Sequence, residues 1–143
     1  MKKLTTRLMI AAAALVVVAG VASAQTMTAS IPFEFRAGNR VMEPGTYWVG
    51  DLQTLSGAPI YRILNQESHK TVVLMPQAPV DREKAWEASG QAKLVFACTS
   101  GSCALAEIYT GSGSHAYTFS HPKLGKNEDA YLRVIPMQPG KGE

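Results

Sequence analysis

Two cysteines are the residues of this chain best suited to covalent chemistry. Cys98 and Cys103 are the only cysteines among the 143 residues, and Thr-Ser-Gly-Ser separates them. A four-residue loop would place them opposite each other on the two strands of a hairpin, with Cα atoms about 4.5–5.5 Å apart. That distance lies within the range of about 4.4–6.8 Å that a disulfide requires. The spacing therefore predicts a structural disulfide between Cys98 and Cys103.

Three other interpretations of the cysteine pair remain open. A redox-active pair normally has two intervening residues at the start of a helix, whereas four residues on an expected hairpin intervene here. A zinc site needs two further ligands, and the three histidines, His69, His115 and His121, are not closely spaced. Two free thiols would be expected in a reducing compartment, which the export pattern of residues 1–24 disfavours.

Histidine and serine spacing favours neither a metal site nor a catalytic site. His115 and His121 would lie about 20 Å apart along a straight strand, too far for one metal ion. The Gly-Ser-Gly-Ser run at 111–114 lacks the Gly-x-Ser-x-Gly nucleophile elbow, although a Ser–His–acid triad assembled from distant residues is not ruled out. Glu83 and Glu87 would share a helix face, and we expect them to be solvated. We therefore predict no catalytic residues, no metal ligands and no cofactor.

Seven aromatic residues admit two interpretations. They would form either a sugar- or ligand-binding face, or core residues and cross-strand pairs, which is the commoner role of aromatics in strands. We favour the second for Tyr47, Trp48, Tyr61, Trp86, Tyr109, Tyr117 and Tyr131.

The elements that must position these residues are mostly short strands. Apolar or alternating runs are interrupted by turn residues every 8–15 positions, which is typical of an all-β protein. We predict a single small antiparallel domain, a sandwich or a small barrel, with about six to eight strands. The expected strands are 31–35, 47–52, 60–65, 71–75, 93–98, 103–110, 115–120 and 131–137. Residues 81–89, closed by Gly90, would form at most a short helix, and 138–143 a frayed tail.

The expected hairpin at 93–110 has the most detailed prediction. If Cys98 opposes Cys103, then Phe96 opposes Leu105 and Leu94 opposes Glu107. Because side chains alternate across a strand, the face that holds Leu94, Phe96, Cys98, Cys103 and Leu105 should pack into the core. Glu107 would then need a cation such as Arg62 or Arg133, unless the strand end is exposed or a bulge shifts the register after Ala106.

The first 24 residues have the pattern of a secretory signal peptide. Three cations precede an uncharged apolar run at 8–21, and Ala22-Ser23-Ala24 provides small residues before Gln25. A 14-residue helix rises only about 21 Å, less than the roughly 30 Å of a bilayer core. We therefore predict cleavage between Ala24 and Gln25, a mature domain at 25–143 in the periplasm or secreted, and no stable membrane anchor after cleavage.

Removal of the signal peptide neutralises the chain. It takes away three of the 14 basic residues and none of the 11 acidic ones, which leaves 11 of each. The remaining cations are scattered singly, whereas nucleic-acid binding needs a basic patch. We therefore expect no nucleic-acid partner.

Three segments carry a family resemblance. Residues 31–38 (IPFEFRAG), 44–49 (PGTYWV) and 93–96 (KLVF) resemble a family of small exported β-rich proteins of acidobacteria and other soil bacteria. The resemblance covers about half of the mature chain and implies export and a small β domain. It implies no active site, because none of the shared segments is catalytic. The cysteine pair departs from the family pattern.

These observations favour a non-enzymatic extracytoplasmic domain that acts by binding or as an envelope component. A small-ligand carrier is the alternative if the sheet closes into a barrel with an apolar interior. An envelope hydrolase is less favoured and would need a histidine hydrogen-bonded to both a serine and an acid.

Overall fold

Two β-sheets make up most of the computed structural model, which describes residues 26–53, 59–111, 115–121 and 130–140. Sheet A has the strand order β12-β1-β4-β5-β6, and all of its neighbours are antiparallel. Its strands are β1 (Thr26–Ile31), β4 (Gly45–Gln53), β5 (Pro59–Asn65), β6 (Thr71–Leu74) and β12 (Gln138–Pro139). In β5 and β6 the burial alternates along the strand, so each of them buries one of its faces.

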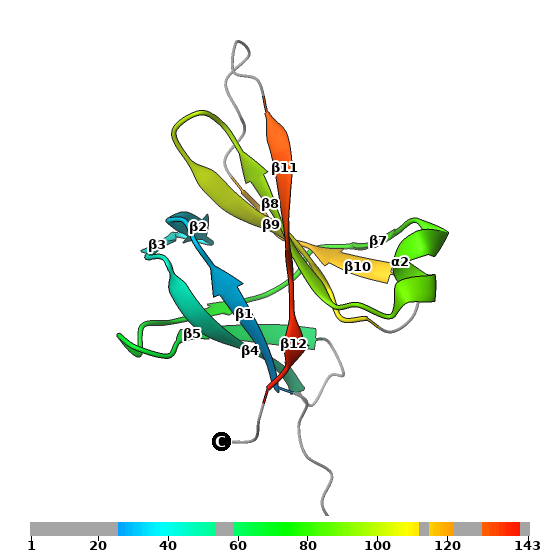
Figure 1. Ribbon diagram of the computed structural model, residues 1–143, viewed down its shortest axis with the longest axis horizontal. Coiled ribbons are helices and arrows are strands. Elements are labelled where there is room, and N and C mark those ends of the chain that lie inside the picture. The colour runs from blue at the N-terminus through cyan, green and yellow to red at the C-terminus, as the bar shows by residue number, and fades with distance from the viewer. Residues whose placement is uncertain (1–25, 54–58, 112–114, 122–129, 141–143) are drawn as a thin grey trace, which may run out of the picture.

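Sheet B contains the remaining strands, in the order β11-β8-β9-β10-β7, with a β2–β3 hairpin beside β9. Its strands are β2 (Phe35–Ala37), β3 (Arg40–Met42), β7 (Pro79–Asp81), β8 (Lys93–Cys98), β9 (Cys103–Tyr109), β10 (His115–Thr118) and β11 (Tyr131–Pro136). The pairing of β2 with β9 is parallel, at Arg36 and Ala104. In the described residues no strand of one sheet pairs with a strand of the other, and the two sheets share one core (Figure 1), as in a sandwich rather than a closed barrel.

The all-β class is confirmed, but the division into strands is finer than predicted. The described residues contain twelve strands instead of six to eight, because several have only two to four residues. The strand expected at 31–35 is interrupted: β1 ends at Ile31 and β2 begins at Phe35. Pro32 lacks an N–H for the ladder, so a strand end is its expected place.

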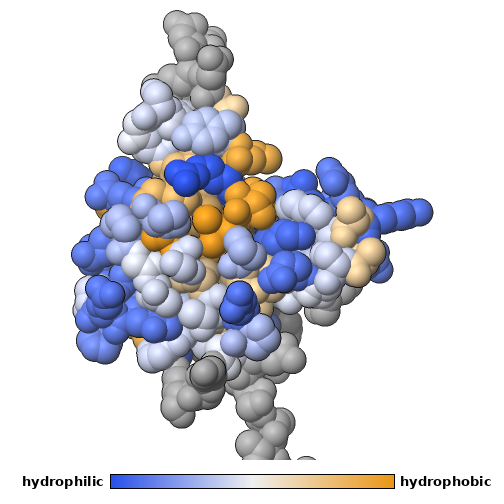
Figure 2. Space-filling view, viewed as in Figure 1, coloured by the Kyte–Doolittle hydropathy of each residue, from blue (hydrophilic) through white to orange (hydrophobic). Residues whose placement is uncertain are grey.

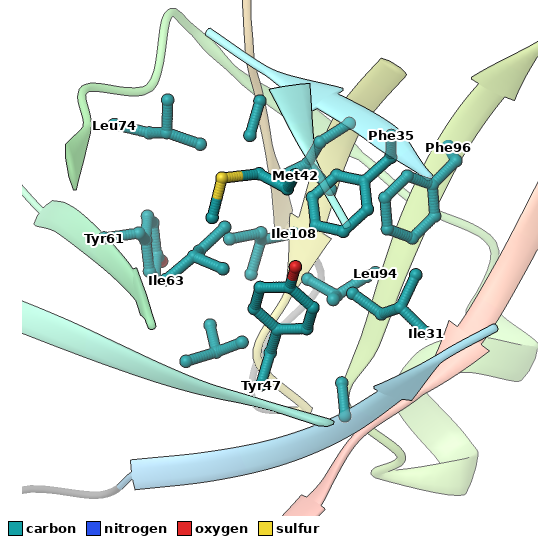
Figure 3. Packing of buried hydrophobic residues seen from close by; sticks show 14 of the residues in the cluster. Ile31, Phe35, Met42, Tyr47, Tyr61, Ile63, Leu74, Leu94, Phe96 and Ile108 are labelled. Atoms are coloured by element: carbon teal, nitrogen blue, oxygen red, sulfur yellow. The ribbon is translucent and has the colours of Figure 1, made fainter. Parts of the chain in front are cut away.

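The core lies between the two sheets and is rich in aromatic rings (Figure 3). The Phe35 ring meets Phe96 at 5.2 Å and Tyr47 at 5.3 Å between centroids, in edge-to-face arrangements. Tyr61 and Ile63 of β5 complete the side that sheet A contributes. The core interpretation of the aromatics is right for Tyr47, Tyr61 and Tyr109, each at most 1% exposed, whereas Tyr131 is half exposed.

The short helix α2 (Lys84–Ser89) falls within the range predicted for it. Gly90 ends it in the left-handed conformation at φ 61°, as a C-terminal glycine commonly does. Trp86 anchors the helix by packing on Tyr109, with ring centroids 5.7 Å apart. Asp81 belongs to β7, and the residue that precedes the helix is Glu83, whose side chain makes no capping hydrogen bond.

The β8–β9 hairpin has the predicted register at its turn and a shifted one farther away. Cys98 opposes Cys103 and Phe96 opposes Leu105, but a bulge follows and Val95 opposes Glu107. The bulge turns Ile108, instead of Glu107, toward the core opposite Leu94. The prediction that Leu94, Phe96, Cys98, Cys103 and Leu105 face the core is confirmed.

The end of the chain connects the two sheets. β11 is an edge strand of sheet B, and the chain continues directly into β12, which pairs with β1 in sheet A (Figure 1). Gln138 and Pro139, which we expected in a frayed tail, oppose Thr28 and Met27. The predicted signal peptide and its cleavage site between Ala24 and Gln25 lie outside the described residues.

Candidate functional site

The predicted cysteine pair lies at the tip of the β8–β9 hairpin. The two sulfur atoms are at disulfide distance, which fits the predicted disulfide. The Cα atoms are 4.0 Å apart, closer than the predicted separation of about 4.5–5.5 Å and below the usual disulfide range of about 4.4–6.8 Å. Cys98 is fully buried and Cys103 nearly so, with 8% of its surface exposed. A pair that faces the core in this way is inaccessible to a large reaction partner, so the geometry suits a structural role better than an exchange reaction.

The three histidines are in three different environments. His69 lies in the β5–β6 turn with a positive φ of 61°. The Nδ1 atom of His115 lies 2.7 Å from Oδ1 of Asp81 across the β10–β7 pair, and both side chains are more than half exposed. His121 lines an open groove between the two sheets. Within the described residues, no serine hydroxyl is hydrogen-bonded to His115, and no cluster of three metal-binding side chains is present.

Glu107 has a different partner from those that we predicted. The bulge directs Glu107 to the outer face of sheet B, where it forms an ion pair with Arg82 instead of Arg62 or Arg133. The guanidinium of Arg82 and the ammonium of Lys93 also lie over the Trp86 ring, at 5.6 and 4.7 Å from its centroid. These contacts attach α2 to the sheet, so they are structural.

The open groove, of about 660 Å³, is the candidate binding site. It lies between the β2–β3 hairpin of sheet B and β6, which is the edge strand of sheet A. The described residues that line it come from three parts of the sequence: Arg36, Gly38, Asn39 and Arg40 of the hairpin, residues 71–74 of β6, and Ser120 and His121 after β10. No motif in the sequence connects these segments.

Two long cations connect the walls of the groove. Nη1 of Arg40 donates a hydrogen bond to the carbonyl of Thr71 at 3.0 Å, and Nζ of Lys70 donates to the carbonyl of Val41 at 3.0 Å. Each bond runs from one hairpin to the other, so the two hairpins are tied reciprocally. The groove is therefore held by specific contacts between the sheets.

Local sequence explains how each hairpin presents its residues. Gly38 takes φ +59° in the β2–β3 turn, and a Cβ at this position would approach the Leu74 side chain to 3.0 Å. Only glycine permits this conformation and this closeness without strain. In the β5–β6 turn, the buried side-chain oxygen of Asn65 accepts hydrogen bonds from the N–H groups of Glu67 and Ser68, which shapes the loop before Lys70.

Exposed hydrophobic side chains form a second surface feature. Figure 2 shows hydrophobic residues gathered around β11 on the face it presents, where Leu132 is 68% and Val134 44% exposed. Both side chains point away from the core, on the edge strand of sheet B. In the part of the chain that the structure describes, no helix has the length and hydrophobicity needed to cross a bilayer.

Comparisons with known proteins add no assignment to this geometry. No protein-family model, no curated protein and no solved structure matches the chain. The functional assignment therefore rests on the groove and its residues.

Sequence analysis missed the groove because its residues carry no local signal. Arg36 directly follows the strand expected at 31–35, and Arg40 lies beside a Gly-Asn turn. The one available hint was that Arg36, Arg40 and Lys70 all flank hairpin turns. This feature of the sequence does not predict that the two hairpins lie side by side, or that His121 lies beside them.

Proposed function

We propose that this protein is an exported, non-enzymatic binding domain that holds its ligand in the groove between the β2–β3 hairpin and β6. The observation that carries the proposal is the groove itself. Its volume of about 660 Å³ lies within the range of about 300–1,000 Å³ that is usual for ligand sites. Its walls come from both sheets, so the folded domain as a whole creates the site.

The contacts between the walls support a preformed site. The hydrogen bonds from Arg40 to Thr71 and from Lys70 to Val41 fix the separation of the hairpins before any ligand arrives. A preformed site loses less conformational entropy on binding than a flexible one. The proposal differs from a carrier with a barrel interior, because the space between the sheets is filled by the core and the groove is on the outside.

The proposal also includes export of the protein and its membership of a family. The signal-peptide pattern at 1–24 supports export to the periplasm or beyond. The resemblance at 31–38, 44–49 and 93–96 supports membership of the small exported β-rich proteins of soil bacteria. An envelope-associated role would place the groove where a cell-surface or periplasmic ligand is accessible.

Native mass spectrometry of the protein purified from its own host tests the proposal. We expect a fraction of the protein to carry a retained ligand mass. Ser120→Trp would place a large ring in the groove and abolish this mass, whereas Ser100→Trp, at an exposed serine of the β8–β9 turn, would keep it. Absence of a ligand mass in the wild type, or its persistence in Ser120→Trp, would contradict the proposal.

A further inference from the structure

We infer that the groove binds an anion that presents phosphate or carboxylate groups, and that Arg36 and Arg40 hold it; this inference rests on the proposed function. Among the described residues, those that line the groove include two arginines and one histidine but no aspartate or glutamate. Lys70 adds a third permanent cation at the rim, where its Nζ reaches Val41 of β3. The positive charges come from both sheets, so the field in the groove is a product of the fold.

The arginines of the groove differ from other cations of this protein. Arg82 is paired with Glu107, Lys93 lies over Trp86, and the guanidinium of Arg133 lies 4.1 Å from the centroid of the Phe33 ring. In contrast, no carboxylate of the described residues forms an ion pair with Arg36 or Arg40. Within the described part of the chain, the positive charge of these two arginines is therefore not neutralised by the protein itself.

The described residues use only a small part of the hydrogen-bonding capacity of these arginines. A guanidinium has five N–H donors, and Arg40 commits one nitrogen, Nη1, to the Thr71 carbonyl. The guanidinium of Arg36 makes no hydrogen bond to any described residue. The planar fork of arginine matches the two oxygens of a carboxylate or phosphate, which makes such bonds both short and strong.

The site also favours an anion over a neutral ligand for a physical reason. Clefts lined by one sign of charge concentrate the field and raise the local concentration of counter-ions. An anion in the groove would satisfy Arg36 and the remaining donors of Arg40 together. A neutral ligand would displace the water that solvates both guanidinium groups without replacing its interaction with their charge.

Calorimetric titration of the exported protein at low ionic strength tests the inference. The probes are tripolyphosphate, citrate and the neutral trisaccharide maltotriose. We expect saturable binding of at least one of the two anions, weakened by added salt, and none of maltotriose. Binding of tripolyphosphate alone would identify a phosphate ligand, and binding of citrate alone a carboxylate ligand.

Three variants connect the binding to Arg36. Arg36→Gln should weaken anion binding by about tenfold or more, as expected for loss of a charge-assisted hydrogen bond. Arg36→Lys keeps the charge without the fork and should fall between Arg36→Gln and the wild type. Lys84→Gln removes the same charge from an exposed position on α2 and should bind as the wild type does.

The outcomes separate this inference from the proposed function. Failure of both anions to bind, or equal losses in Arg36→Gln and Lys84→Gln, would overturn the anion inference. If a neutral ligand mass is then found by mass spectrometry and is lost in Ser120→Trp, the groove remains the binding site and only its ligand class is wrong. Circular dichroism of each variant shows whether the fold is intact.

Discussion

The β8–β9 hairpin and the groove differ in how far apart in the sequence their residues lie. The hairpin joins residues that are neighbours in the sequence, so a four-residue turn and a strict alternation determine its pairing and its buried face near the turn. The groove joins two hairpins and the segment after β10, which belong to different sheets. The pairing of the hairpin near its turn therefore depends on local sequence, whereas the candidate site depends on long-range packing.

The largest expected effect comes from the buried face of the hairpin. Phe96 is fully buried and its ring meets those of Phe33 and Phe35 at 5.0 and 5.2 Å. Phe96→Ala should therefore lower the free energy of unfolding by about 3–5 kcal/mol. Leu132 lies on the neighbouring strand β11 and is 68% exposed. Leu132→Ala should therefore change the free energy of unfolding by less than about 0.5 kcal/mol. Urea unfolding of both variants makes the comparison, and similar small effects would show that the faces are wrongly assigned.

Removal of the cysteine pair should have the next largest effect. Cys98→Ser combined with Cys103→Ser should destabilise the exported protein by about 2 kcal/mol, the chain-entropy value for a loop of six residues. The far-ultraviolet circular dichroism spectrum should be unchanged, because the hairpin register also depends on the packing of Phe96 and Leu105. Free thiols at both positions of the native protein would contradict the disulfide.

The outer face of the hairpin should contribute less than its inner face. Glu107→Gln breaks the ion pair with Arg82, and the Glu107 and Arg82 side chains are 15% and 30% exposed. The expected loss is about 1 kcal/mol, between the values for exposed and for buried pairs. A double-mutant cycle with Arg82→Met isolates the interaction, and a coupling energy near zero would contradict the contact.

Alkaline pH should weaken the core through its tyrosines. Burial raises the pKa of Tyr61 and of Tyr47 above the usual 10.0, and the charge of Asp51 adds to the effect at Tyr61. The unfolded chain therefore loses these protons first, so stability is fully present below pH 10 and falls as the pH rises above it. Tyr61→Phe should flatten this decline in urea unfolding between about pH 9 and 11. An equally steep decline in Tyr61→Phe would exclude Tyr61 as a cause.

Arg36 of the groove should contribute almost nothing to stability. Arg36 is exposed and its guanidinium hydrogen-bonds to no described residue, so Arg36→Gln should change the free energy of unfolding by less than about 0.5 kcal/mol. The same variant should lose ligand binding. A large destabilisation by Arg36→Gln would contradict the view that Arg36 serves binding and the β8–β9 hairpin serves stability.

Sequence analysis predicted the fold class and the hairpin turn because both depend on local patterns. Alternation predicts strands, and the four residues between Cys98 and Cys103 fix which residues oppose each other. It offered the bulge after Ala106 only as an alternative, because Glu107 can avoid burial in several ways. The partner of Glu107 was predicted wrongly, since Arg82 is brought to it by the packing of Trp86 on Tyr109. For the same reason the groove was not predicted: which hairpins meet is decided by the stacking of the sheets.

The central claim is that the groove, and not the β8–β9 hairpin, holds the ligand. Native mass spectrometry of the retained ligand tests it most directly when one variant alters the hairpin and another alters the groove. The fraction of protein that carries ligand should stay near the wild-type value in the Cys98→Ser, Cys103→Ser double variant, although that variant is less stable. The fraction should fall to zero in Ser120→Trp, although its stability is close to that of the wild type. Retention of ligand in Ser120→Trp would contradict the assignment of binding to the groove, and so would loss of ligand in the folded cysteine variant.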